Sequence, residues 1–477
     1  MSVSIQTKNQ HLIWRAAFGP VLENVAQFNQ ISTNELYTLL KTNTTKKTER
    51  FTIAKNMYDG FFKGVQDLGK VQQLTQEQKK QMRKQSIEDL QNLNLTWLDE
   101  MVNTDDQLRE KMSFFWHGHF ACRVINIYFQ QELLHIIREN ALGNFGDLLR
   151  AVSKSAAMIS FLNNQQNKKQ HPNENFAREV MELFTMGRGN YSEQDVKEAA
   201  RAFTGWGFGM QGEFQERAFL HDTGQKTFLH KSGNFNGDDI INMILEQKST
   251  AYFITKKIYL FFVNDEPNET IIQSLATDFY ANNYDLQKLL DSIFLSNWFY
   301  DEKNIGAKIK SPIELIAGIR RILPMDIHTP EYQLLFERSL GQVLFYPPNV
   351  AGWPGGKNWI DSSTLMVRLR LAQIMAESDT FSIQPKDDDD LMMGMEKIKN
   401  KKDFNNFQAT IQWDLLAKKM DKVGRENMYE QLQGFLFQTT STVNPLVVKR
   451  YTNDSSKENY IKTCMIQLMS MPEYQVC

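Results

Sequence analysis

Carboxylates, an arginine and an asparagine are concentrated between residues 173 and 206 of this chain. Asn175, Glu179 and Glu182 fall at i, i+4 and i+7, so a helix would carry all three on one face. Two glutamates one helical turn apart repel each other unless a cation lies between them. Glu179 and Glu182 are therefore candidate metal ligands, and Arg178 is a candidate catalytic residue that would orient them.

A purely structural interpretation of the same helix stays open. Glu174 with Arg178, and Arg178 with Glu182, are pairs at i,i+4 spacing. Each such pair stabilises an exposed helix by only ~0.2–0.5 kcal/mol. The cation between the glutamates would then be Arg201 or Lys197 in place of a metal.

His117 and His119 flank Gly118 in the second chemical motif, a Phe-Trp-His-Gly-His-Phe sequence. Histidines two residues apart point to different sides of a helix, so joint metal binding requires a break at Gly118. If the helix continues, His119 instead follows Leu108, Met112 and Phe115 on an apolar stripe and becomes a hydrogen-bonded core residue. Both interpretations are compatible with the sequence.

Two further pairs have the composition of a site. His221 and Asp222 are adjacent, and an aspartate beside an imidazole can orient it for catalysis or simply shape a turn. Glu132 and His135 have the Glu-x-x-His spacing of di-iron helix bundles, but the chain has one copy where such bundles use two.

The wall of a pocket is predicted from aromatic and polar residues near these motifs. Trp353 and Trp359 lie in a Pro- and Gly-rich segment, residues 345–359, which suits either a pocket wall or a rigid loop over the core. Asn175 and Trp206 border the acidic segment and complete the predicted wall. If all these motifs converge, they form one cavity between helices.

The elements that must position these residues are mostly helices. Apolar residues recur at helical spacing along most of the chain, and Ser311 and Ser192 begin segments with the pattern of a capping box. One β-hairpin is predicted within Phe214–His230, with its turn at residues 221–224. Asp387–Asp390 indicate a solvated insertion. We predict one large, mostly α-helical domain over residues 1–477, with N-terminal helices in 1–150, the acidic helix pair and hairpin in 151–240, and C-terminal helices with the ordered 345–359 loop in 241–477.

Composition and missing motifs exclude several classes of function. The chain has 54 Lys and Arg against 56 Asp and Glu, a net charge of −2, so a nucleic-acid partner is not expected. It has no P-loop, no Gly-x-Ser-x-Gly elbow, no His-Glu-x-x-His and no dinucleotide fingerprint. No segment approaches the ~20 apolar residues of a transmembrane helix, and the N-terminus does not resemble a signal peptide. A cytoplasmic location is expected by default, with envelope association as the alternative.

Several of these stretches together resemble the bacterial family catalogued as domain-of-unknown-function family 1800. They are residues 11–19, 115–120, 138–145, 173–206, 221–226 and 346–356. The resemblance covers nearly the whole chain, although this chain has Gly118 where the family usually has Asn, and His230 where it often has Gly. It implies no settled activity. It does imply a companion from family 1501, which resembles sulfatases and alkaline phosphatases, as a partner in one pathway.

The residues and the resemblance together lead to three functional hypotheses. The first is a metal-dependent hydrolase or oxidase, with Fe, Mn or Zn held by His117, His119, Glu179 and Glu182. The second is a non-catalytic helical protein that binds or assembles with the companion. The third is a carbohydrate-binding helical module built around Trp353 and Trp359.

Overall fold

The protein is mostly α-helical, as predicted, in a computed structural model that describes residues 3–22, 24, 30–55, 75–209, 211–377, 407–441 and 443–477. The predicted insertion at Asp387–Asp390 lies outside these residues. The helices of the first half are α1 (Ile5–Ala16), α3 (Thr33–Asn43), α4 (Gln76–Asn103), α5 (Gln107–His119), α6 (Ile127–Asn140), α7 (Phe145–Ser153), α8 (Ala156–Phe161), α9 (Asn175–Glu182) and α10 (Glu193–Ala202).

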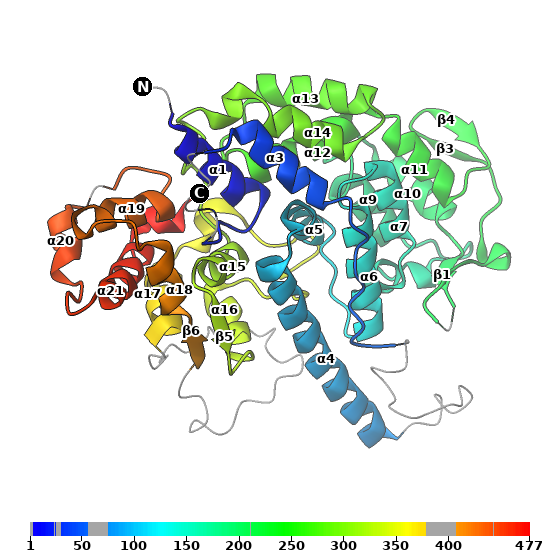
Figure 1. The fold of residues 1–477 in the computed structure, drawn as a ribbon. Helices are drawn as coiled ribbons and strands as arrows, with labels where there is room; N and C mark the ends of the chain where they lie inside the picture. The colour runs from blue at the N-terminus through cyan, green and yellow to red at the C-terminus, as the bar shows by residue number, and fades with distance from the viewer. Residues whose placement is uncertain are drawn as a thin grey trace.

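The second half is also mostly helical. Its helices are α11 (Gly237–Leu245), α12 (Lys248–Phe262), α13 (Glu269–Ala281), α14 (Leu286–Phe294), α15 (Pro312–Ile322), α16 (Tyr332–Leu340), α17 (Ser362–Glu377), α18 (Trp413–Lys419), α19 (Met428–Leu436), α20 (Pro445–Arg450) and α21 (Lys457–Met469). Figure 1 shows α12, α13 and α14 along the upper edge, α18–α21 at the left, and α5 near the centre. The long helix α4 projects below the other elements.

Helix starts follow the capping chemistry predicted from the sequence. Ser192 accepts a hydrogen bond from the backbone N–H of Asp195, and the Asp195 side chain accepts one in return from the N–H of Ser192. Ser311 and Glu314 form the same reciprocal pair at the start of α15, with Pro312 in the first turn. Both capping boxes satisfy N–H groups that the helix itself leaves unpaired.

The β-structure differs from the single predicted hairpin. Strands β1 (Trp206–Phe208) and β2 (Phe214–Glu216) form one antiparallel pair, β3 (Lys226–Phe228) and β4 (Lys231–Gly233) a second, and β5 (Met325–Ile327) and β6 (Ala409–Ile411) a third. Residues 221–224 join β2 to β3, which belong to different sheets, so the predicted turn position is wrong. The β3–β4 reversal occurs at Leu229 and His230, whose φ angles are +46° and +66°, as a two-residue hairpin turn requires.

Two hydrophobic clusters form the core, and three helices contribute to both. Neighbouring residues on α5, Phe114 and Phe115, face different clusters, as do Leu133 and Leu134 on α6. On α1, Ile13 joins the first cluster and Trp14 the second. The helices α1, α5 and α6 therefore lie between the two cores. Among the helices that the structure describes, none is both long and apolar enough to cross a membrane.

Candidate functional site

A cavity of about 950 Å³ lies beside α5, at the centre of the fold. It is bounded by the C-terminal half of α5, by α12, by residues 303–311 and by the 345–359 loop. Its aromatic walls come from Phe114, Phe115, Phe261, Trp353 and Trp359. Its charged lining residues are Lys257, Lys303, Lys308, Lys357, Asp265, Glu266 and Glu314. The cavity shares the aromatic walls of small-molecule sites, which usually have few polar groups, but its lining is more highly charged.

The 345–359 loop reaches the cavity through glycines that permit close packing. Gly352 has φ +85°, and a Cβ atom there would lie 2.4 Å from the carbonyl oxygen of Gly118. Gly356 has φ +60°, and its Cβ would lie 2.9 Å from Oδ2 of Asp265. Since L-residues rarely adopt these φ values and a Cβ would collide, both positions require glycine. The loop is thus seated directly on the His117–His119 segment.

His117 is enclosed by aromatic rings below this loop. Its ring stacks on Trp353 at 5.3 Å and 23°, and meets Trp97 and Phe345 edge-on. Nε2 accepts a hydrogen bond of 3.3 Å from the N–H of Phe345. Burial lowers the pKa of His117 to about 3. A neutral ring that accepts at Nε2 carries its proton on Nδ1, so His117 is a packed neutral histidine.

His119 lies on the cavity wall and is paired with Lys257. Helix α5 continues through Gly118 to His119, so the break that joint metal binding would require is absent, and His119 follows Leu108 and Met112 into the core, as the alternative interpretation expected. Its Nε2 is 3.1 Å from the carbonyl oxygen of Phe184, and its Nδ1 is 3.3 Å from Nζ of Lys257. Burial, and secondarily the charge of Lys257, hold the pKa of His119 well below its usual value.

Lys257 has no carboxylate partner among the described residues. Its Nζ also donates to the carbonyl oxygen of Leu183 at 3.3 Å, and it lies 5.0 Å from the ring centre of Phe253. Burial alone lowers the pKa of Lys257 to about 8. A lysine in this state is easily deprotonated and gains free energy when an anion approaches it.

The other charges of the cavity are partly compensated. Asp265 forms an ion pair with Lys308, and Glu314 with Lys111. Lys303 and Lys357 have no carboxylate within ion-pair distance in the described part of the chain, and neither has Glu266. Three uncompensated lysines thus face one uncompensated glutamate. With four lysines against three carboxylates, the described lining has a net charge of +1, which favours an anion.

The amino-acid sequence matches the model of one protein family. A family model described as "Protein of unknown function (DUF1800)" matches residues 11–476. The chain belongs to the DUF1800 family. No curated protein and no solved structure matches it. The chemistry of this DUF1800 protein must therefore be argued from its own residues.

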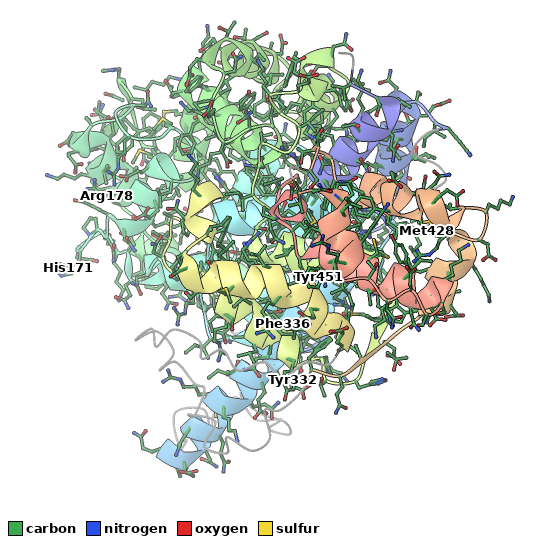
Figure 2. All side chains as sticks on the ribbon, turned by 90° about the vertical axis from the view of Figure 1, so that its left-hand side faces the viewer. His171, Arg178, Tyr332, Phe336, Met428 and Tyr451 are labelled. Carbon is green, nitrogen blue, oxygen red and sulfur yellow. The ribbon has the colours of Figure 1, made fainter. Side chains whose placement is uncertain are left out.

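The acidic helix of this DUF1800 protein is held by ion pairs. Arg178 donates to both carboxylate oxygens of Glu193 at 2.7 Å and to Glu174 at 3.2 Å. Glu182 accepts from Arg188 at 2.5 Å and from the Tyr191 hydroxyl at 2.9 Å. Burial, with the nearby charge of Glu182, raises the pKa of Glu179. The pair of Arg178 with Glu174 is confirmed, whereas Glu182 pairs with Arg188, a cation that the sequence did not indicate. In Figure 2, Arg178 lies at the periphery of the molecule.

The four predicted metal ligands are not brought together as a ligand set. Both nitrogens of His119 have protein partners, and Glu182 is engaged by Arg188 and Tyr191. Among the described residues, no group of three or more His, Cys, Asp and Glu side chains is placed to hold a metal ion. The donor set therefore does not fit a metal centre at His117, His119, Glu179 and Glu182.

The remaining predicted site residues do not line the cavity. Asp222 binds Arg201 of α10 at 2.8 Å, and this contact lowers the pKa of Asp222. His221 lies 3.0 Å from the carbonyl oxygen of Thr204 through Nδ1. Trp206 is buried against Phe203. Asn175 is exposed and donates to the carbonyl oxygen of Leu162 at 3.2 Å. Of the predicted residues, the cavity brings together His119, Trp353 and Trp359, with His117 stacked behind Trp353.

Lys257 is one of the lining residues that were not predicted, although the sequence contains a signal for it. Phe253, Lys257 and Phe261 lie at i, i+4 and i+8 of α12, so a lysine interrupts an aromatic stripe. The acidic segment also contributes to the site in an unpredicted way, because the carbonyls of Leu183 and Phe184, just after α9, receive Lys257 and His119. At Gly187, with φ +76°, a Cβ would lie 2.8 Å from the ring of Phe253, so this glycine lets the turn approach α12.

Proposed function

We propose that the cavity binds a small organic anion whose ring stacks on Trp353 or Trp359. The observation that carries the proposal is the presence of Lys257, Lys303 and Lys357 without carboxylate partners in an aromatic-walled cavity. The ligand class is a cyclic compound, such as a sugar, that carries a sulfate, phosphate or carboxylate group.

Desolvation of Lys257 supports an anion as the missing partner. A buried cation loses its hydration, which raises its free energy. An anion that binds beside it offsets part of this desolvation cost. Neither Leu183 nor His119 offers a charge to do so. The cavity volume of about 950 Å³ falls within the range of small-molecule sites.

The two tryptophans support a ring-bearing ligand. Trp353 is half-buried, with its ring stacked on His117, and it lines the cavity together with Trp359. Indole faces bind flat apolar surfaces, including the faces of sugar rings. The carbohydrate hypothesis based on Trp353 and Trp359 is thereby narrowed to an anionic saccharide.

The companion inferred from the family resemblance fits this ligand class. Sulfatase- and phosphatase-like enzymes act on sulfate and phosphate esters, which are the anions that the cavity would take. We include such a partner, acting on the same ligand before or after this protein, in the proposal. Co-purification of the two proteins from cells that express both checks this part.

Tryptophan fluorescence and calorimetry test the binding. Glucose 6-phosphate, glucose, inorganic sulfate and inorganic phosphate are titrated into the full chain. Glucose 6-phosphate is expected to bind more tightly than glucose, with a change in tryptophan emission. Lys257→Met should weaken the binding by roughly tenfold, the effect of losing one charge-assisted contact of about 1.5 kcal/mol.

A matched control is adjacent in the sequence. Lys256 pairs with Glu269 at 2.8 Å and does not line the cavity, so Lys256→Met should bind as the wild type does. Equal loss in the two variants, or equal binding of glucose and glucose 6-phosphate, would contradict the proposal.

A further inference from the structure

We propose that Lys257 is a catalytic nucleophile that forms an imine with the carbonyl carbon of an anionic aldehyde or 2-oxo acid bound in the cavity. This inference rests on the proposed anion site and names a reaction for it. The relevant observation is that two hydrogen-bond acceptors surround Nζ of Lys257. This amine lies in the wall of a cavity that is large enough to hold a small substrate.

The contacts of Lys257 can serve both its charged form, which attracts an anion, and its neutral form, which can react. A neutral amine has two hydrogens and one lone pair, whereas an ammonium has three hydrogens. Two acceptors lie at 3.3 Å from Nζ, namely Nδ1 of His119 and the carbonyl oxygen of Leu183. With both hydrogens directed to these acceptors, the lone pair is left for a reacting carbon. No described carboxylate lies close enough to hold the amine in its charged form.

His119 is a positioning residue for this amine. Its Nε2 hydrogen is directed to the carbonyl oxygen of Phe184 at 3.1 Å, so Nδ1 presents a lone pair to Lys257. Because the pKa of His119 is held well below its usual value, the ring stays neutral and keeps accepting. The carbonyls of Leu183 and Phe184 thus fix the amine and the imidazole from the same turn after α9.

Some of the charged side chains that line the cavity form ion pairs within the protein, and the others are able to contact a ligand. Around the cavity, Asp265 is bound by Lys308, and Glu314 by Lys111. Lys303, Lys357 and Glu266 complete the charged lining. The two unpaired lysines provide the attraction for the carboxylate or phosphate of the substrate. Phe253 and Phe261 flank Lys257 on α12 and keep its stem in apolar surroundings, which lowers the pKa of Lys257 to about 8.

The reaction is balanced without an oxidant or a reductant. The Nζ lone pair attacks the carbonyl carbon, a C–N bond forms, and the carbonyl π electrons move to oxygen. The two hydrogens of the amine are transferred to that oxygen, which leaves as water while the C=N bond forms. The product is an imine between Lys257 and the substrate, which activates neighbouring bonds of the substrate for proton removal or cleavage.

Reductive trapping tests the imine. The full chain is incubated with pyruvate and cyanoborohydride, which reduces the imine to a stable secondary amine. The intact mass should rise by the mass of one pyruvic acid less one oxygen atom, and peptide mapping should place the adduct on Lys257. The rate of labelling should increase with pH through a midpoint near the pKa of about 8. Lys257→Arg, which keeps the charge but is not a nucleophile, should lose the adduct, and Lys256→Arg should keep it.

Two variants test the role of His119. His119→Leu removes the acceptor and should lower labelling of Lys257 by about tenfold or more. His119→Gln has both an acceptor and a donor and should recover most of the labelling. If both variants label as the wild type does, with the same pH profile, His119 does not position the amine.

Lactate separates this inference from the proposed function. Lactate has the carboxylate of pyruvate but no carbonyl carbon that could react. If lactate binds and pyruvate leaves no preferred adduct on Lys257, the imine is refuted and the anion site stands. If labelling is spread over surface lysines and neither lactate nor glucose 6-phosphate binds, both are refuted. An adduct on Lys257 that Lys257→Arg abolishes, with lactate binding retained, supports both.

Discussion

Nζ of Lys257 lies 3.3 Å from Nδ1 of His119, and no described carboxylate lies within ion-pair distance of that lysine. The two residues are far apart in the sequence, on α12 and α5. Their contact places a lysine without a carboxylate partner in the wall of the aromatic cavity. Burial of a cation without a counter-charge reduces stability, and a buried group with a shifted pKa in a cavity is a candidate functional residue.

The pH dependence of stability should reveal this lysine. Burial lowers the pKa of Lys257 from 10.5 to about 8, so the unfolded chain binds more protons than the folded chain between these pH values. The free energy of unfolding of the wild type therefore rises across that window relative to Lys257→Met. From pH 7 to pH 10, the free energy of unfolding of the wild type should increase by roughly 1–2 kcal/mol relative to that of Lys257→Met, a value that allows for the partial exposure of Lys257. Urea denaturation at both pH values measures it, and Lys256→Met should show no comparable shift.

Glu337 should show the opposite pH dependence. Its carboxyl group is fully buried, accepts from Asn94 at 2.7 Å and from the N–H of Leu344 at 3.1 Å, and has its pKa raised to about 8 by burial. The folded state holds this proton above the ordinary pKa of 4.5, so stability is lost as the pH rises from about 5 to 8. Glu337→Gln should resemble the wild type near pH 5 and be more stable by roughly 2–4 kcal/mol at pH 8. Equal stability differences at the two pH values would contradict this.

Two glycines in contact should respond in opposite directions to alanine. A Cβ on Gly118 meets no atom within 4 Å, so Gly118→Ala should stabilise α5 by about 0.5 kcal/mol through helix propensity. Gly352→Ala combines a left-handed φ of +85° with a Cβ 2.4 Å from the Gly118 oxygen. It should destabilise by about 2–4 kcal/mol. Thermal unfolding of both variants checks the pair, and a neutral Gly352→Ala would mean that the loop is not seated on α5.

The buried carboxylate that holds the helices around the site is Glu110. It accepts from Arg138 Nε at 2.8 Å and from the Trp97 indole at 2.8 Å, which ties α4, α5 and α6 together. Glu110→Gln leaves the buried Arg138 with Glu100 as its remaining carboxylate partner, at 3.2 Å, and should cost about 2–3 kcal/mol. Glu182→Gln, at an ion pair with the exposed Arg188, should cost less than about 1 kcal/mol. Denaturant titration of the two variants decides whether this ranking holds.

Local chemistry was predictable because it acts between residues close in sequence. The capping boxes at Ser192 and Ser311 depend on a side chain and a backbone group three residues apart, so sequence spacing alone located both helix starts. The same range of interaction explains the failure at residues 221–224. These residues have the composition of a turn, but Asp222 binds Arg201 on α10 instead of closing a hairpin. The hairpin turn lies at Leu229 and His230, which have positive φ angles.

The amino-acid sequence by itself determined the helical class, the main helix starts and the family, because these depend on periodicity, capping and shared motifs. Tertiary structure decided which polar groups meet. The partner of His119 depended on the register of α12 and on the direction of the turn after α9. Side chains separated by many residues meet only through packing of whole helices, and one residue of rotation would place Lys256 where Lys257 lies.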